Sequence, residues 1–533
     1  MDRPKILGNK LYLYLTEFFA GMSVMAVELG ASRLLAPYFS SSQIVWTIII
    51  GTIMIAMALG NIYGGRNADR NPDPDRLYRR LAIAAVWIAA IPLAGKYVIL
   101  LISGALVLTV SNNFLILAAF LSCMIVFVFP LFLLGTVTPS LVKYTVSSLD
   151  EGGKVVGNLG AFNTVGSIIG TFLPTFVTIP SVGTAVTFLI FSGILLVLSL
   201  LYFISARRRL VLCIVSTVLF ILCSVFGHSG SFAFWEEDLR YEGESIYNYL
   251  QVRETDRSVI LSTNVLFGVQ SVYQKEPGLT GMYYDYALAA PLMAGADRES
   301  RDMLVLGMGT GTFAVQTERY FPGSRISGVE IDQKITDLAR THFALPERIP
   351  VTTYDGRAYL AGDKNRYDVI MVDAYQDITI PFQMSSVEFF SMVRDHLRPG
   401  GVMVVNMNMR SLEPRGINQY LSDTIASVFP HVATADVPGT TNRELFASMD
   451  AGVVESLGPR ARELPAGELR DMLSSVASRM EPYVPGDCLL TDDKAPVELL
   501  GMAVIDSLIS EELGYYQNIF RQSGLTGLLD ALS

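Results

Sequence analysis

Long apolar runs lie between Leu11 and Gly227, and they place the strongest limit on how this chain can fold. A helix needs roughly 20 apolar residues to cross the ~30 Å hydrocarbon core of a bilayer. Seven stretches meet this requirement, at about 13–37, 44–64, 81–103, 114–136, 158–179, 184–205 and 209–227. The sequence therefore predicts a multi-pass α-helical membrane domain of about seven helices in residues 1–230.

The segments between these stretches differ in charge. Arginines and lysines gather near the N-terminus and in segments 65–80, 137–157 and 206–209, whereas the alternate segments carry none. Basic segments usually face the cytoplasm. With seven crossings the C-terminal half would then lie on the opposite side, and a miscount of one helix would reverse this. We therefore leave the side of the membrane open.

Three ionisable residues, Glu17, Glu28 and Arg33, lie in or near the first stretch. Such residues are costly in a bilayer and usually face a partner or a cavity. They predict either a polar site between helices or a purely structural arrangement, with an internal Glu28–Arg33 ion pair or an Arg33 that reaches the interface. Gly166 and Gly170 form a GxxxG pattern, which is typical of close helix packing.

The overall composition excludes several classes of protein. The net charge of −10 argues against a nucleic-acid partner. Three of the four cysteines lie in apolar runs and the fourth, Cys488, is alone in the C-terminal half, so neither a disulfide framework nor a metal site is expected.

The C-terminal half has the pattern of a water-soluble α/β protein. Tyr247–Arg253, Arg257–Thr263 and Val269–Gln274 predict short strands of a small β-domain in residues 231–290. From 291 to 533, strands alternate with helices, which predicts a Rossmann-like doubly wound parallel sheet. We expect its strands at Met303–Gly307, Arg325–Glu330, Val351–Tyr354, Val369–Asp373 and Val402–Asn406, and its helices at Thr312–Tyr320, Gln333–Phe343 and Ser386–His396.

Glycines and acidic residues stand at the ends of four successive predicted strands. Gly307, Gly309 and Gly311 form a GxGxG turn after the first strand, and glycine lets a ligand approach the backbone closely. Glu330 ends the second strand, where a carboxylate can accept both ribose hydroxyls. Asp355 and Gly356 end the third, where they can meet the adenine amino group, and Asp373 ends the fourth.

This pattern predicts an adenosine-type pocket at the carboxyl edge of the sheet. Single members of the set could instead cap helices or shape turns. A nicotinamide-dependent dehydrogenase would also carry the glycine turn, but it offers no role for Asp355 and Asp373.

Five segments resemble the spermidine synthase (polyamine aminopropyltransferase) family, especially its bacterial membrane-fused branch. Ser245-Ile-Tyr-Asn248 resembles the family's Ser-x-Tyr-Gln, and Tyr283-Tyr-Asp285 resembles its Tyr-His-Glu. Gln270 matches a glutamine that follows the β-hairpin. The remaining two are Asp373-Ala-Tyr-Gln-Asp-Ile-Thr-Ile-Pro381, which looks like the gate loop with its catalytic aspartate, and Leu490-Thr-Asp-Asp-Lys-Ala-Pro-Val-Glu498.

The resemblance implies a role for each matched residue. Asp373 would be the catalytic residue, Asn248 would lie near the sulfonium, and Gln270 would belong to the substrate site. Tyr283, Tyr284 and Asp285 would line the acceptor pocket. The gate segment would add Tyr375 and Asp377 to the substrate-binding residues.

One departure from the family pattern concerns the ligand. Soluble members carry an aspartate in the glycine turn, aimed at the amine of decarboxylated S-adenosylmethionine, and this chain has Thr310 there. Without that carboxylate, intact S-adenosylmethionine would no longer be repelled. The choice between the two ligands therefore stays open.

The resemblance implies a membrane-bound transferase that displaces at the carbon attached to the sulfonium and releases 5′-methylthioadenosine. The acceptor would be a polyamine, or a group of the substrate itself in a cyclisation. A methyltransferase releasing S-adenosylhomocysteine and a non-enzymatic polyamine transporter or sensor remain as alternatives. We expect no cofactor beyond the S-adenosylmethionine-type cosubstrate, and a multi-pass location in the plasma membrane. The expected partners are the lipid bilayer and a small-molecule substrate, with no nucleic acid. A homodimer is left open.

Overall fold

The computed structural model describes residues 5–39, 42–107, 110, 113–146, 152–228, 231–265, 269–294, 300–375, 380–408 and 414–532. The chain forms two compact units. The helical unit contains Met1–Trp235, Gly243–Tyr249 and Ile509–Ser533, and the α/β unit contains Glu236–Glu242 and Leu250–Leu508.

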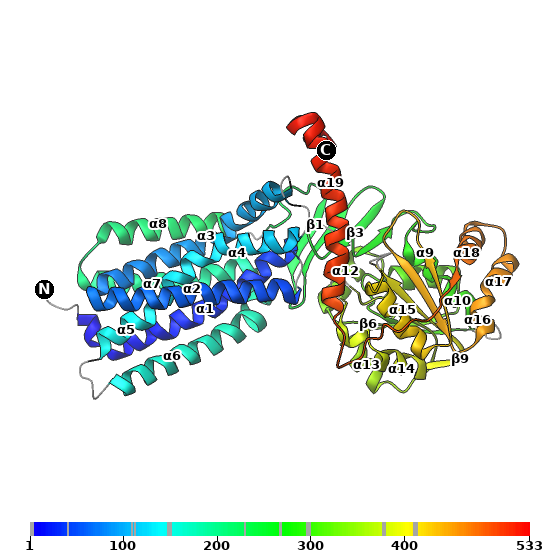
Figure 1. Cartoon of the computed structure of the whole chain (residues 1–533), viewed down its shortest axis with the longest axis horizontal. Helices are drawn as coiled ribbons and strands as arrows, with labels where there is room; N and C mark the ends of the chain where they lie inside the picture. Colours follow the sequence, from blue (N-terminus) through cyan, green and yellow to red (C-terminus); the bar gives the residue numbers. More distant parts are fainter. Residues whose placement is uncertain are drawn as a thin grey trace. The chain divides into compact units, whose positions relative to one another are not determined.

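Long apolar helices make up the helical unit and run alongside one another (Figure 1). After the short 3₁₀ turn η1 (Lys5–Gly8), they are α1 (Lys10–Phe39), α2 (Gln43–Arg70), α3 (Pro74–Val107), α4 (Phe114–Gly135), α5 (Val137–Thr145), α6 (Gly152–Leu173), the π-helical segment η3 (Pro174–Thr178), α7 (Ile179–Ala206) and α8 (Leu210–Gly227). Within the described residues, six helical stretches are long and apolar enough to cross a membrane.

One of these six stretches, Gly152–Ala206, contains two segments, because the chain reverses at Gly183. Gly183 has φ +80° and ψ 169°, a conformation that essentially only glycine adopts. The hydroxyl of Thr187 donates to that of Thr178 at 2.9 Å. In a continuous helix the backbones of these residues would be about 13 Å apart along the axis. The described residues therefore contain seven apolar segments, as predicted.

The outward faces of the bundle are apolar. Met54, Leu101 and Val211 are 66%, 74% and 74% exposed, and many other large apolar side chains are also uncovered. A water-soluble surface rarely exposes such extended apolar patches. These outward faces of the bundle are therefore suited to contact with lipid.

Charged side chains gather at one end of the bundle. Lys143 pairs with Asp69 at 2.9 Å, and both Arg208 and Arg209 lie 3.6 Å from Asp75. These residues come from three segments that the sequence predicts on one side of the membrane. The structure confirms that the segments meet.

The first helix, α1, contacts both α5 and α6. A Cβ atom on Gly166 or Gly170 of α6 would collide with the backbone of Phe18 or Met22 of α1, so the GxxxG pattern serves close packing. Glu17 is fully buried, and its Oε1 accepts hydrogen bonds from Thr138 and Asn163, on α5 and α6.

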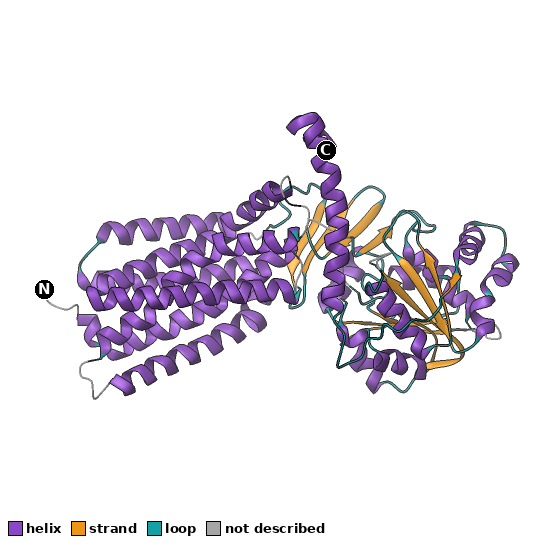
Figure 2. Cartoon of the chain, in the orientation of Figure 1, coloured by secondary structure: helices purple, strands orange, loops and turns teal. Residues whose placement is uncertain are grey.

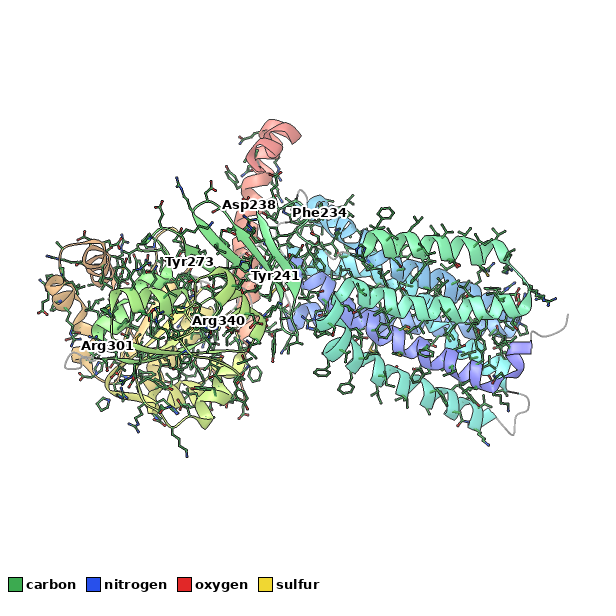
Figure 3. The ribbon with its side chains drawn as sticks, turned by 180° about the vertical axis from the view of Figure 1, so that it is seen from behind. Phe234, Asp238, Tyr241, Tyr273, Arg301 and Arg340 are labelled. Carbon is green, nitrogen blue, oxygen red and sulfur yellow. The ribbon has the colours of Figure 1, made fainter. Side chains whose placement is uncertain are left out.

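A four-stranded antiparallel sheet follows the helices. Its strands are β1 (Leu239–Glu244), β2 (Tyr249–Glu254), β3 (Ser258–Ser262) and β4 (Ser271–Gln274), in that order. Apolar side chains of β2 and β3 pack on α12 (Gln333–His342), with Tyr241 and Tyr273 beside them (Figure 3). β2 to β4 match the prediction closely, while β1 was not predicted.

The second sheet has eight strands in the order β12-β10-β11-β9-β8-β5-β6-β7, with helices around it (Figure 2). They are β5 (Asp302–Leu306), β6 (Arg325–Glu330), β7 (Val351–Thr353), β8 (Tyr367–Val372), β9 (Leu397–Met407), β10 (His431–Asp436), β11 (Arg443–Ser448) and β12 (Glu481–Pro482). β5 to β9 are parallel and confirm the doubly wound prediction, whereas β10 to β12 add an antiparallel extension.

Two apolar cores hold helices on the two faces of this sheet. The helices of the α/β unit are α9 (Tyr283–Ala287), α10 (Ala289–Met293), α11 (Thr312–Tyr320), α12, α13 (Gly356–Gly362), the 3₁₀ turn η4 (Phe382–Met384), α14 (Val387–Asp395), α15 (Ile417–Val428), α16 (Ala451–Glu455), α17 (Leu457–Glu463), α18 (Glu468–Arg479) and the start of α19 (Val497–Leu532). The three predicted helices correspond to α11, α12 and α14.

Candidate active site

The predicted site residues meet where the winding of the sheet changes direction. β5 lies between β6 and β8, so the chain first winds one way from β5 and then crosses back to β8. Ligands of open α/β sheets bind in the crevice at this point, outside the carboxyl ends of the strands. Gly307 directly follows β5, Glu330 ends β6, and Asp373 directly follows β8.

The glycine turn depends on its missing side chains. Gly307, Gly309 and Gly311 all have positive φ, of 86°, 53° and 80°. A Cβ atom on Gly307 would lie 2.5 Å from the carbonyl oxygen of Asp373, so β5 and β8 could not approach as they do. Gly311 is the N-cap of α11, which starts at the turn.

Glu330 fixes the glycine turn from the neighbouring strand. Its side chain is buried, and Oε2 accepts a hydrogen bond from the Gly309 amide at 2.8 Å. Oε1 accepts one from the Asp332 amide at 3.1 Å. Burial raises the pKa of the Glu330 carboxyl, although these backbone amides favour its charged form.

Two neutral side chains hold Asp373. The hydroxyl of Tyr283 donates to Oδ2 at 2.7 Å, and the amide of Asn406 donates to Oδ1 at 2.9 Å. The pKa of Asp373 is raised to about 7. Burial is the largest cause and the charge of Glu330 adds to it, whereas the two hydrogen bonds act in the opposite direction. Asp373 therefore has the proton affinity of a general base that works near neutral pH.

Tyr283 and Tyr284 cover this carboxylate from α9. Their ring centroids are 4.0 Å apart. The Tyr284 hydroxyl lies 3.4 Å from the carbonyl of Gln270, which precedes β4. Burial, together with Asp373, raises the pKa of both tyrosines, so both remain protonated donors at neutral pH.

Three other predicted residues have partners within the fold. Asp285 accepts hydrogen bonds from the amides of Thr280 and Gly281 and so holds the turn before α9. Tyr375 is buried in the apolar core, with its hydroxyl on the carbonyl of Met384. Thr310 is also buried, and its hydroxyl lies 3.2 Å from that of Thr312.

Asp355 lies at the same sheet edge as Glu330 but also has a local role. It is the N-cap of α13 and accepts a hydrogen bond from the Ala358 amide at 2.8 Å. Gly356 begins that helix. Asn248 belongs to the helical unit, where its amide donates to the hydroxyl of Ser245 at 2.9 Å. Asp377 lies outside the described residues.

Sequence reasoning missed three polar residues, one on β9, one on β11 and one directly before β11. Asn442 donates to the side-chain oxygen of Asn406 at 2.8 Å and so orients the amide that Asn406 presents to Asp373. Glu444, on β11, pairs in register with Asn406 and is fully buried. Asn406 ends a predicted strand, so the reasoning that selected Glu330 and Asp373 could have found it.

Within the described residues, no group of three or more histidine, cysteine, aspartate or glutamate side chains is placed to hold a metal ion. A hollow of about 700 Å³ lies beside the first residues of β5, β6 and β8, at the edge opposite the glycine turn. Its arginines pair with its acids, as Arg325 does with Asp302 and Arg348 with Glu318. Gly307, Glu330 and Asp373 lie at the other edge.

Residues 284–446 match the profile of the spermine/spermidine synthase domain. These residues include the glycine turn, Glu330 and Asp373, but not the helical unit. The match therefore covers the part of the chain that contains the candidate site.

Known proteins show similarity over a wider region. A probable polyamine aminopropyl transferase from Bifidobacterium longum is 55% identical over 350 residues, which is 62% of this chain and 78% of that protein. A human eEF1A lysine and N-terminal methyltransferase is 30% identical over 28% of this chain, but only 23% of its own length is covered. A probable spermidine synthase structure from Corynebacterium glutamicum is 23% identical, covers 46% of this chain and 97% of its own, and has a TM-score of 0.36. The long match to the Bifidobacterium relative shows that the chain belongs to the spermidine synthase (polyamine aminopropyltransferase) family and is a spermidine synthase-like transferase.

Proposed function

We propose that the α/β unit transfers the carbon chain of an S-adenosylmethionine-type sulfonium to an amine and releases 5′-methylthioadenosine. The glycine turn and Glu330 would hold the nucleoside, as such turns do at the switch point of a doubly wound sheet. Asp355 would approach the adenine. The name of the Bifidobacterium relative supports a polyamine as the acceptor.

The geometry of Asp373 is the observation that carries this proposal. Its carboxylate lies beside the glycine turn, is oriented by Tyr283 and Asn406, and has a pKa of about 7. In the reaction, the amine lone pair forms the new C–N bond while the C–S bond breaks and its electron pair stays on sulfur. The new ammonium then passes a proton to Asp373. Asp373 and Tyr283 thus orient the neutral amine, Asp373 takes up the proton that the new ammonium releases, and the sulfonium supplies a good leaving group.

Thr310 determines how widely the donor can vary. A threonine in the glycine turn carries no charge that would repel the carboxylate of intact S-adenosylmethionine. We therefore include both the decarboxylated and the intact form as donors, and with the intact form a cyclisation by the substrate's own group. A methyltransferase would instead release S-adenosylhomocysteine. The human relative, which matches a short part of this chain, is named a methyltransferase.

Product analysis separates these reactions. The full chain in detergent is incubated with S-adenosylmethionine or its decarboxylated form, with and without putrescine, and the products are resolved by mass spectrometry. We expect methylthioadenosine that depends on putrescine. Methylthioadenosine without added amine would indicate cyclisation, and S-adenosylhomocysteine would indicate methyl transfer. If neither product formed, the proposal would be refuted.

We further propose that the enzyme is a multi-pass protein of the plasma membrane. The seven apolar segments and the exposed apolar faces support this location. The paired basic segments at one end would face the cytoplasm. An odd number of crossings then directs the chain after Gly227 to the opposite side.

Reporter fusions test this topology. An alkaline phosphatase or fluorescent protein placed after residue 150 should report the cytoplasm, and one placed after the C-terminus should report the opposite side. If both fusions report the cytoplasm, one apolar segment does not cross, and the proposed topology is wrong while the location in the membrane stands.

A further inference from the structure

A second buried carboxyl group lies next to the candidate active site and has no partner. Glu444 is fully buried on β11, and neither of its carboxyl oxygens has a hydrogen-bond partner among the described residues. A buried, unpaired carboxyl is costly, and folded proteins keep few of them. Other buried polar atoms of the α/β unit, such as the hydroxyl of Thr317, also lack a partner, but Glu444 is the carboxyl group there with both oxygens unpaired among the described residues. A buried carboxyl of this kind indicates a missing partner.

The strand geometry directs Glu444 toward the site. It pairs in register with Asn406 of β9, and directly opposed residues of an antiparallel pair have their side chains on the same face. Asn406 reaches Asp373 from that face. Phe446, two residues further along β11, belongs to the core that also contains Tyr284 and Ala287 of α9. Glu444 therefore lies on the side of the sheet that α9 covers.

Among the described residues, the charged or polar groups that bear on Glu444 are Arg443, Asp373 and the two donors to Asp373. Its strand neighbour Arg443 pairs with Asp436 at 2.5 Å, and alternation along a strand points Arg443 to the other face. The two described donors to Asp373 are an amide and a phenol, both uncharged. The charge of Asp373 adds to burial in raising the pKa of Glu444.

We infer that Glu444 binds a protonated amino group of the substrate, as a second acidic residue beside Asp373. A cation between two carboxylates removes the cost of burying them, which no neutral ligand would do. A carboxylate at the same position would be repelled, so this part of the site accepts a primary alkylammonium group and excludes the carboxylate of an amino acid. This inference rests on the proposed function, and it would restore a negative charge that Thr310 does not provide.

The alkylammonium group could come from the acceptor amine or from the donor. The two sources are distinguished kinetically with the Glu444→Gln variant, which keeps the shape but removes the charge. We expect the KM of one amine substrate to rise about 10- to 100-fold, with kcat and the KM of the other substrate within about threefold of wild type. A rise for putrescine assigns Glu444 to the acceptor, and a rise for decarboxylated S-adenosylmethionine assigns it to the donor.

A matched control keeps the test specific. Glu318 is a glutamate of the same unit that pairs with Arg348 at the opposite edge of the sheet. Glu318→Gln should leave both KM values unchanged. The melting temperature of Glu444→Gln without ligand should equal or exceed that of wild type, because the substitution removes a buried acid without a partner.

Binding keeps the inference testable even if no product forms. Putrescine, spermidine and decarboxylated S-adenosylmethionine are each added to wild type and Glu444→Gln, and the shift in melting temperature is measured. If at least one amine stabilises wild type and not the variant, the inference holds even where the proposed reaction fails. If the variant has unchanged KM values and responds to every amine as wild type does, or if wild type responds to none, Glu444 is not an ammonium site.

Discussion

The helical unit and the α/β unit each bury a carboxyl group, but they treat it differently. In the helical unit, Glu17 accepts hydrogen bonds at one oxygen from Thr138 and Asn163, each on a different helix. In the α/β unit, Asp373 and Glu444 face one sheet edge, and both oxygens of Glu444 are unpaired among the described residues. Oε2 of Glu17 also has no partner among the described residues, but its other oxygen joins two helices, whereas neither oxygen of Glu444 has a structural partner there. This difference is consistent with the proposed chemistry in the α/β unit.

The largest expected effect is at Asp373. Asp373→Asn should lower kcat for methylthioadenosine release by ~10²–10⁴, because an amide cannot accept the proton of the amine. Asp436→Asn is the control, since Asp436 pairs with Arg443 away from the site. An Asp373→Asn enzyme with full activity would remove Asp373 from the mechanism.

A glycine substitution in each unit should separate binding from assembly. Gly307→Ala should destabilise the α/β unit by about 1–3 kcal/mol and weaken binding of the adenosyl ligand, because the added Cβ would meet the backbone of Asp373. Gly170→Ala should loosen the contact of α6 with α1 and lower the melting temperature, with the KM for the adenosyl ligand unchanged.

Two controls complete this pair. A Cβ on Gly362 or Gly157 would meet no atom within 4 Å, so Gly362→Ala and Gly157→Ala should have small effects on melting temperature. If Gly170→Ala changed the KM for the adenosyl ligand as much as Gly307→Ala, the two units would not have separate roles.

Tyr283→Phe should change the pH dependence of the reaction. The Tyr283 hydroxyl lowers the pKa of Asp373, which is about 7, so its removal should raise that pKa by up to about one unit. Asp373 accepts a proton only when ionised, and activity therefore rises with pH through this pKa. The acid limb of the kcat/KM profile should move to higher pH, with a larger loss of activity at pH 6 than at pH 8. An unmoved limb with a uniform loss would show that Tyr283 acts on the substrate instead.

The smallest effect is expected at Glu17. Glu17→Gln retains an acceptor for Thr138 and Asn163, so methylthioadenosine release in detergent should stay within about twofold of wild type. A large loss of activity would contradict the division of roles and assign the buried acid of the helical unit a part in the reaction.

Patterns that repeat along the sequence predicted much of this structure. Long apolar runs predicted the helices of the helical unit, and the alternation of strand patterns with helix patterns predicted β5 to β9. Ligands of such sheets bind at the carboxyl ends of the parallel strands, and this rule predicted that Gly307, Glu330 and Asp373 lie at one edge. These features depend on local spacing, which a single sequence contains.

The unpredicted features depend on contacts between distant segments. Glu444 lies within a mixed polar and apolar strand, and only the register of β11 against β9 brings it beside Asn406. Tyr375, which is predicted to bind substrate because it lies in the gate segment, is buried with its hydroxyl on the carbonyl of Met384. Neither fact has a local signature in the sequence.

The backbone of Gly183 has a consequence for supply. Its conformation, with φ +80° and ψ 169°, divides one long apolar stretch into two and, in the proposed topology, makes the number of crossings odd. If that position were straightened into a helix, the count would become even and the α/β unit would emerge in the other compartment. Under the proposed function and topology, one residue without a side chain would thus decide which pool of amines and adenosyl donors the enzyme meets.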